Sequence, residues 1–137
     1  MRQINISHPL ILAVDDNSDN LLLLSLALEL FGFSCLCLNR AKYAVDLARY
    51  FQPQLILLDI VMADISGIDV AKFLKVEPQT AEIPLVGMTA MVTHQYPRCW
   101  PIHIFDDFLT KPYLLDDLEH TISRHLGNKQ KSTAYAV

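Results

Sequence analysis

The sequence predicts a doubly wound α/β domain, in which helices cover both faces of a five-stranded parallel sheet. Short apolar runs alternate with segments of helical periodicity along most of the chain. The runs are apolar at consecutive positions, as in strands that lie between two layers of helices. The length of 137 residues suits one domain with a sizeable core.

Five short runs predict the strands. "LILAV", "SCLCL" and "LILLD" have the length and apolar content of buried strands, and "LVGM" follows a proline. "DDFLT" is a shorter candidate that begins with two acids. The predicted strands are therefore 10–14, 34–38, 55–59, 85–88 and 106–110. The expected order in the sheet is 2-1-3-4-5, the flavodoxin-like arrangement.

Helical spacing of apolar residues predicts the segments between the strands. Asn17-Ser18-Asp19 offers N-cap side chains to the first helix, and Gly32 is its predicted end. The second helix covers 41–51 and is stopped by Pro53, and a third is expected around 68–76. The residues predicted to face the core are Leu21, Leu24, Leu28 and Phe31; Ala44, Val45 and Ala48; Val70, Phe73 and Leu74; and, in a final helix, Leu115, Leu118, Ile122 and Leu126.

Two segments depart from the regular pattern. Between Ala90 and Asp106, Pro97 and Pro101 interrupt the expected fourth helix, so we predict a short or distorted one. After Gly127 the sequence loses its periodicity. We therefore expect a domain at 1–127 and a flexible tail at 128–137.

Composition argues against several classes of function. The net charge is −4 and no basic patch stands out, which argues against direct binding to nucleic acid or to an anionic membrane. The apolar runs are too short to span a bilayer and no N-terminal signal pattern is present, so a cytoplasmic location is expected. Cys35 and Cys37 should share one strand face, where small core residues in a reducing cytosol are favoured over a redox or metal pair.

Carboxylates follow two strands that should be neighbours. In a doubly wound sheet, ligands bind beyond the carboxyl ends of the strands where the strand order reverses, here between strands 1 and 3. Asp15 and Asp16 follow the first strand, and Asp59 ends the third. Three carboxylates this close repel one another unless a cation neutralises them, and hard oxygen ligands suit Mg²⁺. Capping of the following helix by Asp16 or Asn17 is the structural alternative.

Two further side chains should reach the same edge of the sheet. Lys111 follows the fifth strand and is the natural counterion for the acids. Pro112 favours an extended backbone at Lys111, and the Lys111–Pro112 peptide bond can be either cis or trans. Thr89 ends the fourth strand and adds a hydroxyl, although Thr89 alone is better explained as a helix N-cap.

Together these residues resemble the receiver domains of two-component response regulators, over about residues 10–126. The resemblance rests on Asp15-Asp16, Asp59, Thr89-Ala90 and Lys111-Pro112, with Gly67 and the "IP" pair at 83–84 as context. It implies that Asp59 accepts a phosphoryl group from the phosphohistidine of a sensor histidine kinase or phosphotransfer protein. It also implies that Asp15, Asp16 and Asp59 hold Mg²⁺ together with the backbone carbonyl of Val61.

The resemblance implies a role for three residues around the phosphoacceptor. Lys111 would neutralise the phosphoryl oxygens, in keeping with the dependence of phosphoryl transfer on positioning and charge. Thr89 would move to hydrogen-bond one of those oxygens. Phe108 would then turn inward as the switch aromatic, which biases a pre-existing equilibrium between two arrangements.

Several positions depart from the family pattern. Ala63 stands where the family usually has a proline, and Ile104-Phe105-Asp106 replaces a "GAD"-like turn. Val61 and Met91, which flank the phosphorylation site in the family, are apolar here, so neither can orient an attacking water. We therefore expect a phosphorylated Asp59 that hydrolyses slowly.

The expected function is that of a stand-alone, chemotaxis-type receiver, a phosphoprotein rather than an enzyme. The residues after 127 leave no room for a DNA-binding domain, so the output would be a phosphorylation-dependent protein contact, with homodimer formation left open. The alternative is a degenerate receiver that binds partners without phosphorylation. A phosphatase would need a second acid at Val61, and "DDNSDN" would repel the phosphate of a flavin.

Overall fold

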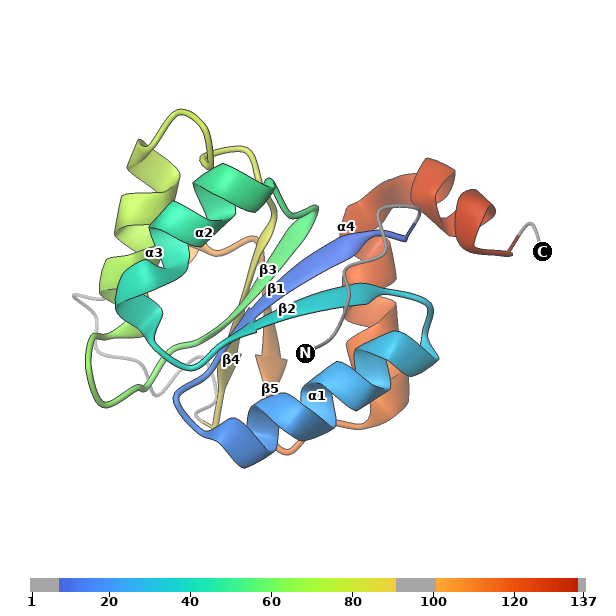
Figure 1. Cartoon of the computed structure of the whole chain (residues 1–137), viewed down its shortest axis with the longest axis horizontal. Coiled ribbons are helices and arrows are strands. Elements are labelled where there is room, and N and C mark those ends of the chain that lie inside the picture. The colour runs from blue at the N-terminus through green and yellow to red at the C-terminus, as the bar shows by residue number, and fades with distance from the viewer. Residues whose placement is uncertain (1–7, 91–100, 136–137) are drawn as a thin grey trace.

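The computed structural model describes the backbone of residues 8–90 and 101–135 and the side chains of those ranges up to residue 126. Its centre is a parallel sheet of five strands in the order β2-β1-β3-β4-β5 (Figure 1). The strands are β1 (Leu10–Val14), β2 (Ser34–Leu38), β3 (Leu55–Asp59), β4 (Leu85–Thr89) and β5 (Asp107–Thr110). The predicted fold class and strand order are confirmed.

Helices lie on both faces of the sheet, with α1 and α4 on one side and α2 and α3 on the other (Figure 1). The helices are α1 (Ser18–Leu30), α2 (Ala44–Phe51), α3 (Gly67–Val76) and α4 (Leu115–Tyr135). Two 3-10 turns, η1 (Ala41–Tyr43) and η3 (Ile102–Ile104), precede α2 and β5. The predicted distorted fourth helix falls mostly on residues 91–100, outside the described residues.

The strands contribute alternate side chains to two separate cores. On β1, Leu12 and Val14 pack with α2 and α3, whereas Ile11 and Ala13 pack with α1 and α4. Leu55 to Leu58 of β3 alternate in the same way, and all four are at most 1% exposed. Burial on both faces explains why β1 and residues 55–58 of β3 are apolar at consecutive positions.

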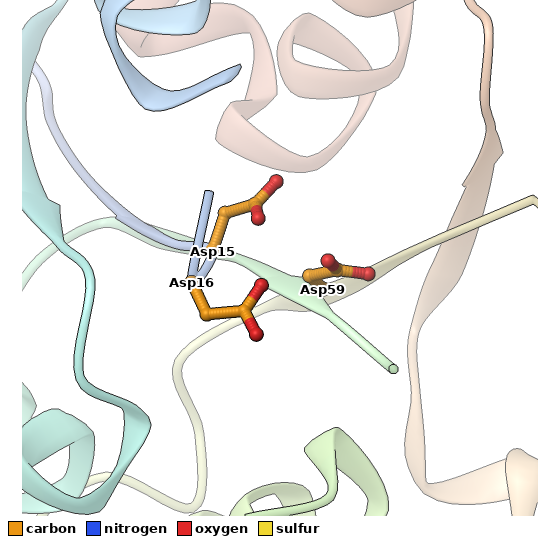
Figure 2. Close-up of side chains that lie close together, drawn as sticks. All are labelled: Asp15, Asp16 and Asp59. Carbon is orange, nitrogen blue, oxygen red and sulfur yellow. The ribbon is translucent and has the colours of Figure 1, made fainter. Parts of the chain in front are cut away.

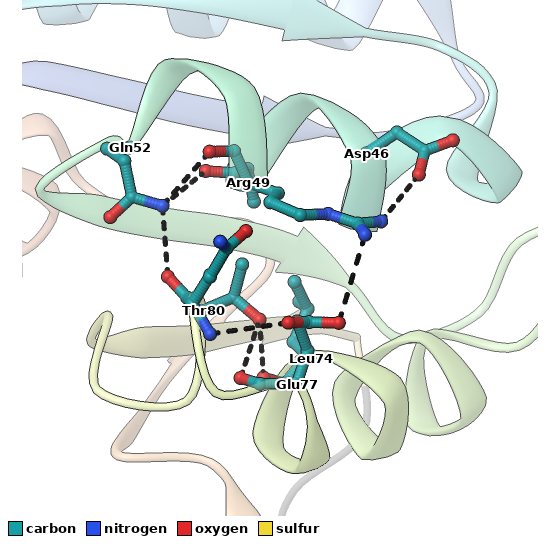
Figure 3. Close-up of polar contacts among 8 residues, drawn as sticks. Asp46, Arg49, Gln52, Leu74, Glu77 and Thr80 are labelled. Carbon is teal, nitrogen blue, oxygen red and sulfur yellow. Dashed lines mark hydrogen bonds and ion pairs between the residues drawn. The ribbon is translucent and has the colours of Figure 1, made fainter.

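The end of α2 is fixed by contacts with the turn after α3 (Figure 3). Gln52 ends α2 in the left-handed conformation, with φ of 49°. Its amide Nε2 donates to the carbonyl of Arg49 at 3.1 Å and to that of Gln79 at 2.9 Å. Below it, the hydroxyl of Thr80 donates to the carbonyl of Leu74 at 2.6 Å. These bonds satisfy carbonyls that a helix end leaves unpaired.

Three details of the helices differ from the sequence prediction. Leu115, at the start of α4, is 51% exposed and does not face the core. Phe73 is 56% exposed, because Ala71 rather than Phe73 completes the buried stripe of α3 with Val70 and Leu74. Helix α4 continues to Tyr135, past its predicted end at Gly127. A single glycine costs a helix only about 1 kcal/mol, and the following residues are mostly compatible with a helix. The domain boundary at residue 127 stays a prediction.

No helix in the described part of the chain combines the length and the apolar character that a bilayer crossing requires.

Candidate functional site

The carboxyl ends of β1 and β3 lie side by side. Val14 is paired with Leu58 in the register of the two strands, so Asp15 and Asp59 leave the sheet at neighbouring positions. Their side chains and that of Asp16 lie close together (Figure 2). Carboxylate oxygens of the three residues lie within 4.8 Å of one another. The predicted acidic cluster is therefore present in the structure.

The three carboxylates differ in their exposure to solvent. Asp15 is 2% exposed and Asp59 is 8% exposed, whereas Asp16 lies at the surface. Burial raises the pKa of the Asp59 carboxyl above its usual range. The negative charge of Asp15 raises it further, and the positive charge of Lys111 offsets part of the rise. The site therefore favours binding of a cation.

Lys111 lies between the two buried acids. Its Nζ is 2.9 Å from Asp15 Oδ2 and 3.3 Å from Asp59 Oδ2. Burial disfavours the ammonium, but the hydrogen bond to Asp15 and the charges of Asp59 and Asp15 together raise the pKa of Lys111. The backbone holds Lys111 in place, because its N–H donates to the carbonyl of Thr89 at 2.7 Å. The following bond to Pro112 is cis.

Backbone N–H groups fix the other carboxylate oxygens. The N–H of Asn17 donates to Asp15 Oδ1 at 2.9 Å, and the N–H of Ala63 donates to Asp16 Oδ2 at 2.7 Å. A proline at position 63 could not make the second bond, because it lacks an N–H. The helix cap is Asn17, whose Oδ1 accepts from the N–H of Asn20 at 2.9 Å. Of the two capping candidates, Asn17 is therefore confirmed and Asp16 is not the cap.

Gly67 lets the loop after β3 close against the strand. Its N–H donates to the carbonyl of Ile60 at 2.8 Å. A Cβ atom at this position would lie 2.6 Å from Ile60 Cα and closer still to the backbone oxygen of Asp59. Only glycine fits this approach, so the glycine that the sequence marks as supporting context is sterically required.

The two predicted switch residues lie on neighbouring strands. Thr89 ends β4 and is 2% exposed, and Phe108 is a half-buried residue of β5 paired with Gly87. The ring of Phe105 lies 5.2 Å from that of Phe108, centroid to centroid, and fills the space that the missing side chain of Gly87 leaves. Phe105, which is part of the segment that replaces a "GAD"-like turn, is thus accommodated by the absence of a side chain at Gly87 of β4.

An apolar groove opens beside the acidic cluster. It has a volume of about 660 Å³ and runs along α1 to the start of α4, past Lys111 and Tyr113. Two of its leucines, Leu23 and Leu30, are 67% and 75% exposed. Sequence analysis missed both the groove and Tyr113. The run of leucines on all sides of α1 was the available indication, since a helix that is apolar all round needs a partner.

The oxygen donors fit a hard divalent cation. Asp15, Asp16 and Asp59 supply the carboxylates that Mg²⁺ prefers, and Asp16 is exposed enough for bound water to complete the coordination. Coordination by the carbonyl of Val61 stays a prediction. The backbone hydrogen bond from Val61 to Asp59 acts to lower the pKa of Asp59, but it offsets only part of the rise that burial causes. Met91 lies outside the described residues.

A doubly wound sheet with an acidic cluster and a lysine at the point where the strand order reverses is typical of one class of signalling domain. The model of the response regulator receiver domain matches residues 11–123, and the chain belongs to this family. Members of the family accept a phosphoryl group in two-component signalling. The chain is 29% identical to the polar-differentiation response regulator DivK of Brucella anthropi over 118 residues, which span 86% of this chain and 96% of that protein.

Solved structures agree with the family assignment. A response regulator from Desulfuromonas acetoxidans is 32% identical and has a TM-score of 0.75, with 86% of this chain and 96% of that chain covered. The receiver domain of a sensor histidine kinase from Pseudomonas aeruginosa has a TM-score of 0.81 at 22% identity, covering 88% and 99% of the two chains. That structure contains a magnesium ion in its active-site cleft, but at this identity the likeness bears on the fold alone.

Proposed function

We propose that this protein is a cytoplasmic receiver that accepts a phosphoryl group on Asp59 and then signals through protein contacts. The donor is the phosphohistidine of a sensor histidine kinase or phosphotransfer protein. The observation that carries the proposal is the contact of one ammonium, that of Lys111, with both Asp15 and Asp59 in a cluster of three carboxylates. Such a cluster is costly for folding alone and is suited to bind charge.

The chemistry follows from the residues around Asp59. A carboxylate oxygen of Asp59 attacks the phosphorus, the bond from phosphorus to the donor imidazole breaks, and its electron pair returns to the ring nitrogen. Lys111, 3.3 Å from Asp59, neutralises a phosphoryl oxygen as charge builds up. Mg²⁺ bound by Asp15, Asp16 and Asp59 would supply further positive charge there.

The proposed output uses the switch residues and the groove. The hydroxyl of Thr89 would bond a phosphoryl oxygen, and Phe108 would change its packing against Phe105. The groove along α1 is our candidate docking surface for the phosphodonor, because it is apolar and leads to Asp15 and Lys111.

Phosphorylation of Asp59 can be tested by intact mass. The protein is incubated with Mg²⁺ and a small phosphodonor, and we expect the added mass of one phosphoryl group. Asp59→Ala should abolish the addition, whereas Asp64→Ala should keep it, since Asp64 is exposed and outside the acidic cluster. A wild-type protein that stays unmodified with both a small donor and its kinase would favour the degenerate binding module.

The lifetime of the phosphorylated state gives a second prediction. Val61 is 64% exposed, and its side chain has no polar atom to orient water near Asp59. Val61→Asn should therefore speed the loss of the phosphoryl group by about tenfold, less than the ~100-fold that a fully positioned base supplies. Decay would be timed by mass spectrometry after removal of the donor, with Val61→Ala as the control. A decay of Val61→Asn no faster than that of wild type would contradict this.

A further inference from the structure

Two cysteines form a second cluster of reactive groups, which differs chemically from the acidic site. Cys35 and Cys37 are two residues apart on β2, one of the two edge strands of the sheet, and their side chains share one face. Their sulfur atoms lie 3.3 Å apart, farther than the ~2.05 Å of a disulfide bond between them. Cys35 is half-buried and Cys37 is exposed, so the expectation that both are core residues is wrong for Cys37.

The strand geometry permits a disulfide between the two sulfurs but makes it strained. Two residues of a β-strand advance by about 6.6 Å, which is close to the upper end of the Cα separations found in disulfides, about 6.8 Å. The sulfurs must approach from 3.3 Å to about 2.05 Å, a movement that side-chain rotation can supply. A bridge near the geometric limit is easily reduced again.

The surroundings favour a disulfide over a metal site. Structural zinc sites use four ligands, and the cysteine pair supplies two. Among the residues that the structure describes, the one group of three or more potential metal ligands is the aspartate cluster, which does not include a cysteine. The 3.9 Å contact of Cys37 Sγ with the carbonyl of Leu21 places the pair beside α1 instead.

We propose that Cys35 and Cys37 are a reversible dithiol–disulfide pair whose oxidant is a small disulfide such as glutathione disulfide. The exposed thiolate of Cys37 attacks one sulfur of the oxidant, the oxidant's S–S bond breaks, and one small thiol leaves. The thiolate of Cys35 then attacks Cys37 Sγ, and the second small thiol leaves. Two protein thiols are oxidised and one small disulfide is reduced to two thiols, so atoms and electrons balance.

The exposures of the two residues assign their roles. Cys37 is open to solvent and can meet the oxidant, whereas half-buried Cys35 is placed 3.3 Å away to resolve the mixed disulfide. The ring that closes contains only one residue between the cysteines, so the bridge adds little to stability by restricting the unfolded chain. Its use is therefore a reversible change at the edge strand rather than a structural crosslink.

The test uses the full chain with Cys99→Ser, which removes the third thiol. The protein is treated with glutathione disulfide, remaining thiols are blocked with N-ethylmaleimide, and the intact mass is measured. We expect the loss of two hydrogens, no bound glutathione and no blocked thiol, all reversed by dithiothreitol. Adding Cys35→Ser should leave one stable glutathione on Cys37, and adding Cys37→Ser should leave Cys35 largely unmodified.

Other outcomes would overturn the proposal. These are a stable glutathione adduct while both cysteines are present, a disulfide between two chains, or two thiols that stay available to the blocking reagent. A Cys35→Ala variant and circular dichroism of each variant show whether a result comes from the missing thiol, which can no longer resolve the mixed disulfide, or from a protein that no longer folds. The readout depends neither on Asp59 nor on phosphorylation, so the result stands apart from the proposed signalling function.

Discussion

Replacing Lys111 with methionine should lower the free energy of unfolding by about 2 kcal/mol. The substitution leaves Asp15, which is 2% exposed, without the ammonium that lies 2.9 Å from it. Breaking a fully buried ion pair in this way costs about 3–5 kcal/mol, and the remaining exposure of Lys111 makes the expected loss smaller. Urea denaturation would measure it, with Lys72→Met on the exposed side of α3 as the matched control.

The same variant should change the pH dependence of stability. Because the folded protein raises the pKa of Lys111, its contribution is fully present below the ordinary lysine value of 10.5. The contribution is lost as the pH rises through the higher value of the folded state. The free energies of wild type and Lys111→Met should therefore converge at strongly alkaline pH. A variant as stable as wild type near neutral pH would show that Lys111 does not offset the buried acids.

Lys111→Met should also slow phosphorylation of Asp59 by about 100-fold, the effect of removing one group that stabilises developing charge. Initial rates with a small phosphodonor would measure this, provided that the variant is assayed where it is fully folded. Added Mg²⁺ should recover part of the lost stability, because a ligand that binds only the folded state shifts the equilibrium toward it.

Replacing Gly67 with alanine should lower the free energy of unfolding by about 3 kcal/mol. The new Cβ would lie 2.6 Å from Ile60 Cα and would also press on the backbone oxygen of Asp59. Both neighbours are backbone atoms at the end of a buried strand, so neither can rotate away. The movement that relieves the clash displaces Asp59, and phosphorylation should slow as well.

Gly32→Ala is the matched control for this clash. Gly32 has a φ of 89°, and a Cβ atom there would meet nothing within 4 Å. Alanine should therefore cost only the backbone strain of a left-handed conformation, about 1 kcal/mol. Equal losses for the two variants would indicate that strain of the chain, and not the close approach of two backbones, limits substitution at Gly67.

The residues themselves determined the fold and the chemistry of the site. A strand buried on both faces is apolar at consecutive positions, which is why Leu55 to Leu58 identify β3 without further information. The carboxyl ends of neighbouring parallel strands meet at one edge of a sheet, so Asp15 and Asp59 had to lie together once the strand order was inferred. The departure at Ala63 was also visible in the sequence.

Only the tertiary structure decided how the loops around the site meet. Three contacts depend on how separate segments of the chain meet. Ala63 donates to Asp16, Gly67 at the start of α3 touches the backbone of Ile60, and Phe105 fills the space above Gly87 of β4. The same holds for the exposure of Phe73 and for the 3.3 Å between the sulfurs of Cys35 and Cys37. Periodicity reports which face of an element is buried. It carries no information about the distance between two groups that the folded backbone brings together, and that distance sets both steric fit and reactivity.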